Sequence, residues 1–295
     1  MRHGENGQAV VTEEQFEEHR SQLHAVAHRM LGSSVDADDA LQDAWLRVSR
    51  SDTAAVENMA AWLTTVVARI CLDQLRSRRQ RREVHVPDPI ITPEDAVGPE
   101  ESALMADGVG LALLVVLESL TPPERLAFVL HDTFGVPFEE IAMMLDRTPE
   151  AARKLASRAR RRVRGQAPEP GPDLGRQREV VDAFFAAARS GDFDALVSVL
   201  HPDVVLRSDG GTARPQLNLV IHGAEEVAAQ ARLTSQLAPF VRPVLVNGAP
   251  GAVVAPRDRA QVVMAFTVTD GRIVAIDVLA DPERLADLEL SEILG

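Results

Sequence analysis

Apolar residues recur at helical spacing in the first part of the chain and predict three amphipathic helices between residues 12 and 82. The first helix opens with Thr12 and Gln15, which have the order of a capping box. The second helix is expected at about 36–49 and the third at about 57–82. Their apolar faces should meet in a three-helix bundle. The expected buried positions are Phe16, Leu23, either Val26 or Ala27, Met30, Leu41, Ala44, Trp45, Val48, Met59, Trp62, Leu63, Val66 and Ile70.

A second helical segment is expected at about 106–166, and it ends with two helices joined by a tight turn at Asp146-Arg147. The sequence at 121–124 has the order of a capping box with proline in the first turn. Thr148 is a good N-cap for the final helix, and Pro149 stands at the first helical position, where its missing N–H costs nothing. The apolar face before the turn is Phe138, Ile141, Ala142 and Leu145, and the basic residues after it are Arg153, Lys154, Arg158, Arg160, Arg161, Arg162 and Arg164.

A short, capped, arginine-rich helix after a tight turn is typical of a helix-turn-helix whose second helix enters the major groove of DNA. The alternative is a solvated basic helix on an ordinary α-hairpin, which arginine runs alone often form. The turn, the cap and the one-sided apolar face together favour DNA binding.

Strand-like runs appear in the last third of the chain, mixed with helical patterns at 176–200 and 222–237. In the longest run, Asp270-Gly271 lies between alternating apolar residues, which is a strong β-hairpin signal. This part is therefore predicted to be an α+β domain, with helices against a curved antiparallel sheet. The runs are DVVLRS, RPVLV, GAVVAP and RAQVVMAFTVTDGRIVAIDVL.

Two proline-rich segments separate these parts. Residues 84–100 carry four prolines and no helical period, so they are expected to be a flexible linker. The segment APEPGPDLG is expected to be a second one. The predicted organisation is a helical domain at 11–83, a linker at 84–107, a helix-turn-helix domain at 108–166, a linker at 167–175 and the α+β domain at 176–290.

The net charge of −13 argues against a protein that coats nucleic acid without sequence preference, although basic residues are concentrated locally. Acidic surface elsewhere would suppress stray DNA binding and could meet a basic protein partner. Cys71 is the only cysteine, which excludes an internal disulfide and a multi-cysteine zinc site. The apolar run at 111–117 is too short for a membrane and is expected to be a core helix. Without a signal peptide or a spanning segment, we expect a cytoplasmic protein with no membrane association.

The order of these parts resembles the extracytoplasmic-function (ECF) group of bacterial RNA polymerase sigma factors, and within it the subgroup with a C-terminal SnoaL-like extension. Residues 36–48 look like the polymerase-binding helix of sigma region two, and residues 61–83 look like its promoter-melting and minus-ten-reading segment. Residues 120–164 look like sigma region four, which reads the minus-thirty-five element, and residues 190–211 are similar to SnoaL-like folds. The resemblance implies two all-α sigma modules followed by an α+β SnoaL-like cone-shaped barrel.

Three short motifs of that subgroup are present in altered form. Residues 85–89 read His-Val-Pro-Asp-Pro, where the family's linker tends to carry Trp-Leu-Pro-Glu-Pro. Residues 281–285 read Asp-Pro-Glu-Arg-Leu in place of the terminal Asn-Pro-Asp-Lys-Leu. The loop usually written Asp-Gly-Gly-Gly-Lys begins here with Asp209, Gly210 and Gly211. From the residues alone this loop is a turn. The resemblance implies a regulatory interaction loop that touches the sigma part or the polymerase.

A sigma factor lends sequence preference and strand capture to core RNA polymerase, so the implied partners are the polymerase and promoter DNA. Acidic groups on the polar side of the second helix could pair with a basic polymerase surface; without the resemblance, a solvated helix is the simpler interpretation. Arginines at the end of the third helix would neutralise phosphates, and the first turns of the recognition helix would face base edges. The polymerase-binding set is Asp36, Asp39, Gln42 and Asp43. The phosphate-binding arginines of the third helix are Arg76, Arg78, Arg79, Arg81 and Arg82. In the recognition helix, the residues expected in the groove are Arg153, Lys154 and Arg158, assisted by Ser157, and those expected at the DNA backbone are Arg161, Arg162 and Arg164.

Two other classes of protein are considered: a SnoaL-like hydrolase or cyclase with DNA-binding appendages, and a ligand-responsive repressor. The titratable groups of the last domain are His201, Asp209, His222 and Asp277, and no paired spacing among them requires acid–base chemistry. Two helical modules joined by a proline-rich linker favour the sigma factor. We expect no enzymatic activity, metal or cofactor, a monomer when free, and a SnoaL-like pocket that could take a small ligand.

Overall fold

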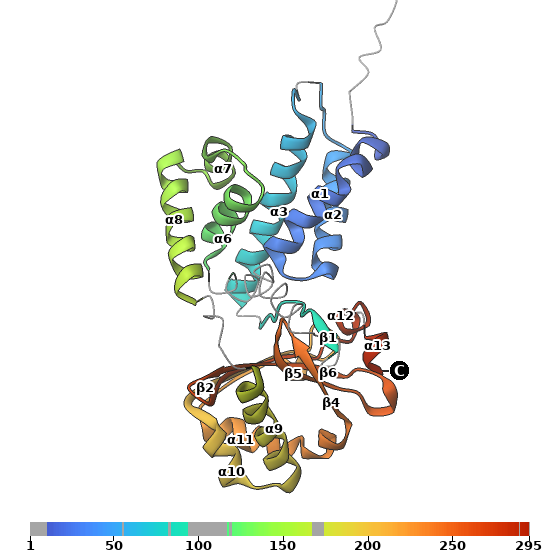
Figure 1. Ribbon diagram of the computed structural model, residues 1–295. Helices are drawn as coiled ribbons and strands as arrows, with labels where there is room; N and C mark the ends of the chain where they lie inside the picture. The colour runs from blue at the N-terminus through green and yellow to red at the C-terminus, as the bar shows by residue number, and fades with distance from the viewer. Residues whose placement is uncertain are drawn as a thin grey trace, which may run out of the picture. The chain divides into compact units, whose positions relative to one another are not determined.

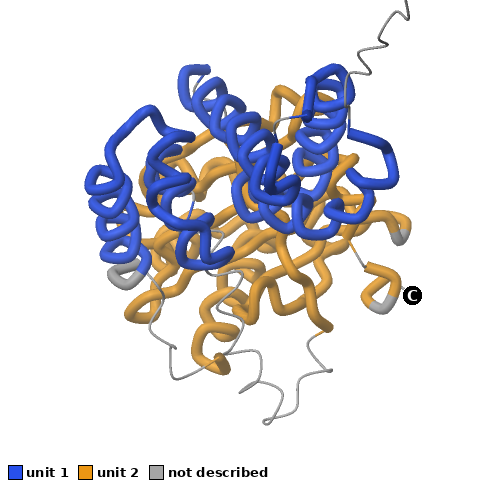
Figure 2. Tube along the Cα trace, turned by 90° about the horizontal axis from the view of Figure 1, so that it is seen from above, with its two compact units in different colours: residues 1–82, 116–166 blue, residues 83–115, 167–295 orange. Residues whose placement is uncertain are grey.

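The computed structural model describes residues 11–54, 56–81, 84–93, 117, 120–166, 174–288 and 290–294. The chain divides into two compact units, coloured differently in Figure 2. The first unit holds both helical modules, and the second holds the α+β domain together with the predicted linker, of which the structure describes residues 84–93. Their ranges are 1–82 with 116–166, and 83–115 with 167–295.

The first module is a bundle of helices whose apolar faces meet, as the sequence pattern predicted. Trp45 was expected in this core but is half-buried at its edge, where its ring packs against Phe16. The capping box of Thr12 and Gln15 is present at the start of α1. This helix ends at Gly32, whose φ of 79° is a left-handed conformation that favours glycine. The helices are α1 (Glu13–Leu31), α2 (Ser34–Val48) and α3 (Met59–Arg81).

The face of α3 that packs into the core is not the face that the sequence pattern predicted. Met59, Trp62 and Val66 were expected in the core but are half-buried, because Val67 and Cys71 occupy the buried face instead. The buried residues of α3 are Leu63, Thr64, Val67, Ala68, Ile70, Cys71, Leu72 and Leu75.

The second module contains the predicted helix-turn-helix. Thr121 and Glu124 form the expected capping box. Asp146 has a φ of 51°, which closes the tight turn, and the Thr148 hydroxyl caps the following helix. Except for its last residue, the core helix predicted at 111–117 lies outside the described residues. The elements are α6 (Pro122–Phe128), the π-helical turn η2 (Val129–Thr133), α7 (Phe138–Leu145) and α8 (Pro149–Gln166).

Arginine side chains join the two modules inside the first unit. Arg125 is 2% exposed, and it donates to the carbonyl of Met30 at 2.8 Å and to that of Leu117 at 2.9 Å. Arg69 on α3 donates to the carbonyl of Met143 on α7 at 3.2 Å. Because a buried guanidinium needs acceptors, Arg125 ties α6 to the last turn of α1.

The second unit has a seven-stranded sheet in the order β1-β4-β5-β6-β7-β2-β3, with α9, α10 and α11 on one face (Figure 1). Neighbouring strands are antiparallel except β2 and β7. The predicted hairpin is present, because Asp270 and Gly271 join β6 to β7 with φ of 51° and 74°. The strands β1 and β3 were not predicted. The elements are β1 (Ile91–Pro93), α9 (Leu174–Ser190), α10 (Phe193–Val199), β2 (Leu200–Asp209), β3 (Leu219–His222), α11 (Ala224–Leu233), β4 (Val241–Val246), β5 (Ala249–Val254), β6 (Val262–Thr269), β7 (Arg272–Leu279), α12 (Pro282–Ala286) and α13 (Ser291–Leu294).

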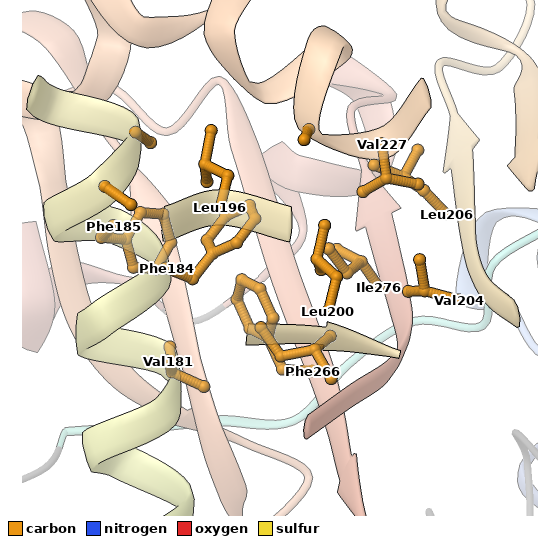
Figure 3. Close-up of a cluster of buried hydrophobic side chains, with 14 of the residues drawn as sticks. Val181, Phe184, Phe185, Leu196, Leu200, Val204, Leu206, Val227, Phe266 and Ile276 are labelled. Carbon is orange, nitrogen blue, oxygen red and sulfur yellow. The ribbon is translucent and has the colours of Figure 1, made fainter. Parts of the chain in front are cut away.

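Apolar side chains fill the layer between the helices and the sheet of the second unit (Figure 3). The rings of Phe184, Phe185 and Phe266 pack edge to face, with centroids 5.5–5.6 Å apart. Leu196 and Leu200 add to the same core and are fully buried. The expected fold class, two all-α modules followed by an α+β domain, is confirmed.

Residues 84–93 follow a defined course that their composition did not predict. Their last residues form β1, which pairs with β4 so that Ile91 lies opposite Val246. Just before it, Ile90 donates its N–H to Asn247 Oδ1 at 2.9 Å and accepts from the Asn247 N–H at 2.8 Å. Proline is tolerated in an edge strand, which explains why a proline-rich segment can still extend a sheet. The rest of the predicted linker, 94–107, lies outside the described residues.

The thiol of Cys71 should be inert in the native protein. It is fully buried, and burial raises its pKa to about 12, so almost no thiolate exists at neutral pH. We expect no reaction of the folded protein with a chromogenic disulfide reagent at pH 8 and prompt reaction in denaturant, followed by absorbance. Rapid labelling of the native protein would contradict this packing.

Candidate functional site

The helix α8 turns one face to the core and the opposite face to solvent. Side chains on a helix follow each other at 3.6 per turn, so Lys154, Ser157 and Arg161 lie opposite the buried positions, and all three are exposed. We call these three residues the outward stripe. The buried positions of α8 are Ala152, Leu155, Ala156 and Ala159.

Glu124 binds two further arginines of α8, which flank the outward stripe on one side. Its side chain is 5% exposed; Oε2 accepts from Arg162 at 2.7 Å, and Oε1 lies 3.7 Å from Arg158. The backbone N–H and the hydroxyl of Thr121 also donate to Oε2, at 3.1 and 2.7 Å. Burial alone would raise the pKa of Glu124, but the hydrogen bonds from Thr121 and the charges of Arg162 and Arg158 hold it below its ordinary value. The carboxylate is therefore ionised at neutral pH.

Two arginines on the other side of the outward stripe also have acidic partners. Arg153 lies 3.2 Å from Glu139, and Arg160 lies 2.7 Å from Asp132. The Glu139 side chain is 63% exposed, so its pair with Arg153 is weak. The two basic residues of the outward stripe form no ion pair with any residue that the structure describes.

The predicted run of arginines at the end of α3 also contains both ion-paired and exposed side chains. Arg78 is 17% exposed and forms an ion pair with Asp36 on α2, so it holds two helices of the bundle together. Arg76 has an acidic partner on its own helix. Arg79 and Arg81 are exposed, whereas Arg82 lies outside the described residues.

A polar stripe on α2 contains three of the four residues predicted to bind the polymerase. Asp39, Gln42 and Asp43 are exposed at helical spacing, and Leu46, 48% exposed, continues the stripe by one turn. Asp36 stands apart, because it is partly buried in its ion pair with α3. The stripe therefore exposes an apolar side chain beside acidic groups.

Arg284 is the centre of a buried cluster that holds residues 85–88 against the C-terminal domain. Its side chain is 5% exposed and donates to Asp209 Oδ2 at 2.8 Å and to Asp88 Oδ1 at 2.6 Å. It also donates to the Val86 carbonyl, while the Val86 N–H donates to Asp209 at 3.0 Å. His85 Nδ1 lies 3.5 Å from the same carboxylate. We call Arg284, Asp209, Asp88, Val86 and His85 the linker clamp.

The turn that follows β2 shapes the linker clamp and requires glycine. Gly211 has a φ of 60°, and a Cβ there would lie 1.7 Å from a carboxylate oxygen of Asp281. A Cβ on Gly210 would lie 2.3 Å from the carbonyl oxygen of Arg214. The Gly210 N–H donates to Asn218 Oδ1 at 2.6 Å. The predicted turn is therefore present, and its acid, Asp209, belongs to the linker clamp.

The titratable groups considered for acid–base chemistry have separate partners. Asp277 pairs with Arg207 at 2.6 Å, and Asp209 is held in the linker clamp. His201 accepts the N–H of Asp203, and His222 is exposed. A groove of about 520 Å³ lies between α9 and the strands β4 and β5, but none of these four groups lines it. Among these four side chains, the structure therefore does not place an aspartate beside a histidine.

Family comparisons match both helical modules. The Sigma-70 region 2 family matches residues 15–81, and the Sigma-70 region 4 family matches residues 110–163. These two regions in this order define a sigma factor of bacterial RNA polymerase. Among the described residues, every helix is too short or too polar to cross a lipid bilayer.

Individual proteins extend this match to nearly the whole chain. The ECF RNA polymerase sigma factor SigJ of Mycobacterium tuberculosis is 39% identical over 94% of each chain, and the probable ECF sigma factor SigI of the same species is 34% identical over 92% of this chain and 93% of its own. The crystal structure of SigJ aligns with a TM-score of 0.57 and 35% identity, covering 95% of this chain and all of the other. The chain therefore belongs to the ECF RNA polymerase sigma factors. It is a transcription initiation factor, not an enzyme, and it binds core RNA polymerase and promoter DNA.

Two residues that organise these surfaces were not identified as such from the sequence. The sequence identified Glu124 only as part of a capping box. Nothing in the local pattern indicates that its side chain contacts the arginines of α8. Arg284 lies in the altered motif at 281–285, which was the available signal, but its partners are up to 198 residues away. Both roles depend on contacts between distant segments.

Removing the Arg284 charge should release residues 85–93 from the C-terminal domain. The variant Arg284→Met leaves two carboxylates without their cation, and breaking such a buried pair costs about 3–5 kcal/mol. We expect hydrogen exchange at the amides of Val86 and Ile90 to accelerate by about 100-fold or more, since 1.4 kcal/mol is a factor of ten. Arg207→Met, which removes the partner of Asp277, is the control and should leave those amides protected. Unchanged exchange in Arg284→Met would contradict the clamp.

Proposed function

We propose that the outward stripe of α8 reads the minus-thirty-five element, with Arg153 beside it. This proposal is supported by the exposure of Lys154, Ser157 and Arg161 and by the lack of ion pairs to the two basic ones among the described residues. An arginine that binds a guanine edge discriminates against the wrong base by about 1–3 kcal/mol. At the end of α3, the exposed Arg79 and Arg81 would bind backbone phosphates near the minus-ten element.

Polymerase binding is assigned to the polar stripe of α2, formed by Asp39, Gln42, Asp43 and Leu46. The exposed leucine supplies apolar contact, and the acids supply charge complementarity to a basic partner. Asp36 acts indirectly, since its ion pair with Arg78 fixes α2 on the bundle. The protein would act in the cytoplasm, where the polymerase works, as a monomer before it joins the core enzyme.

The C-terminal domain is proposed to regulate the sigma modules by holding the segment that connects them. The single observation that carries this proposal is the linker clamp, in which Arg284 binds residues of the connecting segment from the C-terminal domain. With the clamp closed, the tether between region two and region four is attached to a third domain, which limits the arrangements the two modules can reach. A small ligand could act on this domain through the groove beside α9.

Opening of the first unit is a further requirement of promoter binding. A compact unit of about 130 residues has a radius of gyration of about 14 Å. The two promoter elements, about 25 base pairs apart by their names, span about 85 Å of B-form DNA at a rise of 3.4 Å. Region four must therefore separate from region two, and the contacts of Arg125 and Arg69 must break. The packed arrangement is the resting state.

The regulatory proposal is tested by run-off transcription with core RNA polymerase and a pool of genomic promoter fragments. Arg284→Met and a chain that ends at Ala280 both lose the clamp cation, so both should change transcript yield in the same direction. The control is Arg207→Met, which should transcribe like the unchanged protein. If both clamp variants transcribe at the unchanged level, the linker clamp has no regulatory role.

The opening proposal is tested with a crosslink between the modules. Cysteines introduced by Arg69→Cys and Met143→Cys can be joined by a short bis-maleimide, because Cys71 is buried and unreactive. The crosslinked protein should lose transcription from promoters that need both elements. Each single variant treated with the reagent should keep it. Full transcription by the crosslinked protein would rule out an obligatory opening.

A further inference from the structure

Glu124 lies where it can control how many arginines of α8 reach DNA. Its carboxylate is buried, it is fixed by two hydrogen bonds from Thr121, and it contacts Arg158 and Arg162 on the adjacent helix. Both arginines are about half exposed, so their guanidinium groups lie at the protein surface beside the outward stripe. At Arg162, the carboxylate accepts at 2.7 Å from a donor that a DNA phosphate would also bind, whereas Arg158 is held by charge alone at 3.7 Å.

We propose that Glu124 is a positioning residue for promoter discrimination, which holds Arg158 and Arg162 back from phosphates of non-promoter DNA. The proposal rests on the assignment of DNA binding to α8. Contacts to phosphate raise affinity for every sequence equally, whereas contacts to base edges distinguish one sequence from another. By sequestering two arginines, the carboxylate lowers the sequence-independent part of binding and leaves recognition to the outward stripe.

The burial of Glu124 separates it from the other acids that contact α8. Glu139, beside Arg153, is 63% exposed and Asp132, beside Arg160, is 25% exposed, so water and salt compete with both pairs. Glu124, at 5%, is shielded and ionised, because the hydrogen bonds of Thr121 and the two arginines keep its pKa low. Glu139→Gln therefore serves as a matched control in the same module.

The test is the salt dependence of binding to a labelled duplex of mixed sequence without a promoter, measured by fluorescence anisotropy on the full-length chain. In Glu124→Gln the amide still accepts from Thr121 but no longer holds the arginines by charge. The slope of log K against log salt should become more negative by about 1 to 2, since each phosphate contact contributes about 0.9. Glu139→Gln should leave the slope almost unchanged. A purely structural role of Glu124 would lower thermal stability without steepening the slope.

A double-variant comparison identifies the arginines involved. Arg162→Gln alone should leave the salt slope unchanged, because Arg162 is already bound to Glu124. The double variant Glu124→Gln with Arg162→Gln should show only about half of the steepening of the slope that Glu124→Gln shows alone. In run-off transcription, Glu124→Gln should reduce the preference for an intact over a mutated minus-thirty-five element.

Two results would overturn the proposal. The first is that Glu124→Gln and the unchanged protein bind the duplex equally, or that neither binds it. The second is that Arg162→Gln alone makes the salt slope less negative. Lys154→Gln and Arg161→Gln separate this failure from that of the underlying assignment. If these two flatten the slope while Glu124→Gln has no effect, α8 binds DNA and only the role of Glu124 is wrong. If none of the three changes the slope, the assignment of DNA binding to α8 fails as well.

Discussion

The course of the segment between the sigma regions depends on one buried guanidinium, that of Arg284. A buried cation is stable only when anions and carbonyls satisfy it, and here the acceptors come from two separate segments, Asp209 on β2 and Val86 with Asp88 in the linker. Satisfying this charge therefore requires the linker to be bound to the C-terminal domain. The pairing of β1 with β4 extends the same contact along the sheet edge. One electrostatic requirement thus joins a proline-rich segment to residues more than a hundred positions later in the chain.

Ion pairing with nearby acids also separates the basic residues of the helix-turn-helix into paired and unpaired groups among the described residues. Arginines that look equivalent in the sequence differ in the structure, because acids of α6, η2 and α7 lie beneath some of them and not beneath others. A negatively charged protein that must bind DNA selectively gains from this arrangement, since unpaired cations attract any phosphate. The number of arginines in the sequence of α8 is therefore a poor guide to the number whose side chains are without an acidic partner among the described residues.

Local patterns predicted the elements of this chain well, because caps, turns and hairpins are encoded by neighbouring residues. The capping boxes at Thr12 and Thr121, the helix-turn-helix and the hairpin at Asp270-Gly271 all follow from short-range physics. The ordered course of residues 84–93 did not follow, because an edge strand of three residues owes its stability to its partner β4 and to Arg284. Local patterns also do not show contacts between helices. Asp36 was predicted to bind the polymerase and Arg78 to bind DNA, but in the structure they form an ion pair with each other.

The separation of the clamp residues along the chain has a consequence for protein synthesis. Asp88 and Arg284 are 196 residues apart. At about 5–20 residues per second, a ribosome needs about 10–40 s between the two. During that time region two and region four have left the ribosome, or are leaving it, without the arginine that closes the clamp. Under the proposed regulation, control by the C-terminal domain begins only after Arg284 has been synthesised, and chains terminated before Arg284 would escape it.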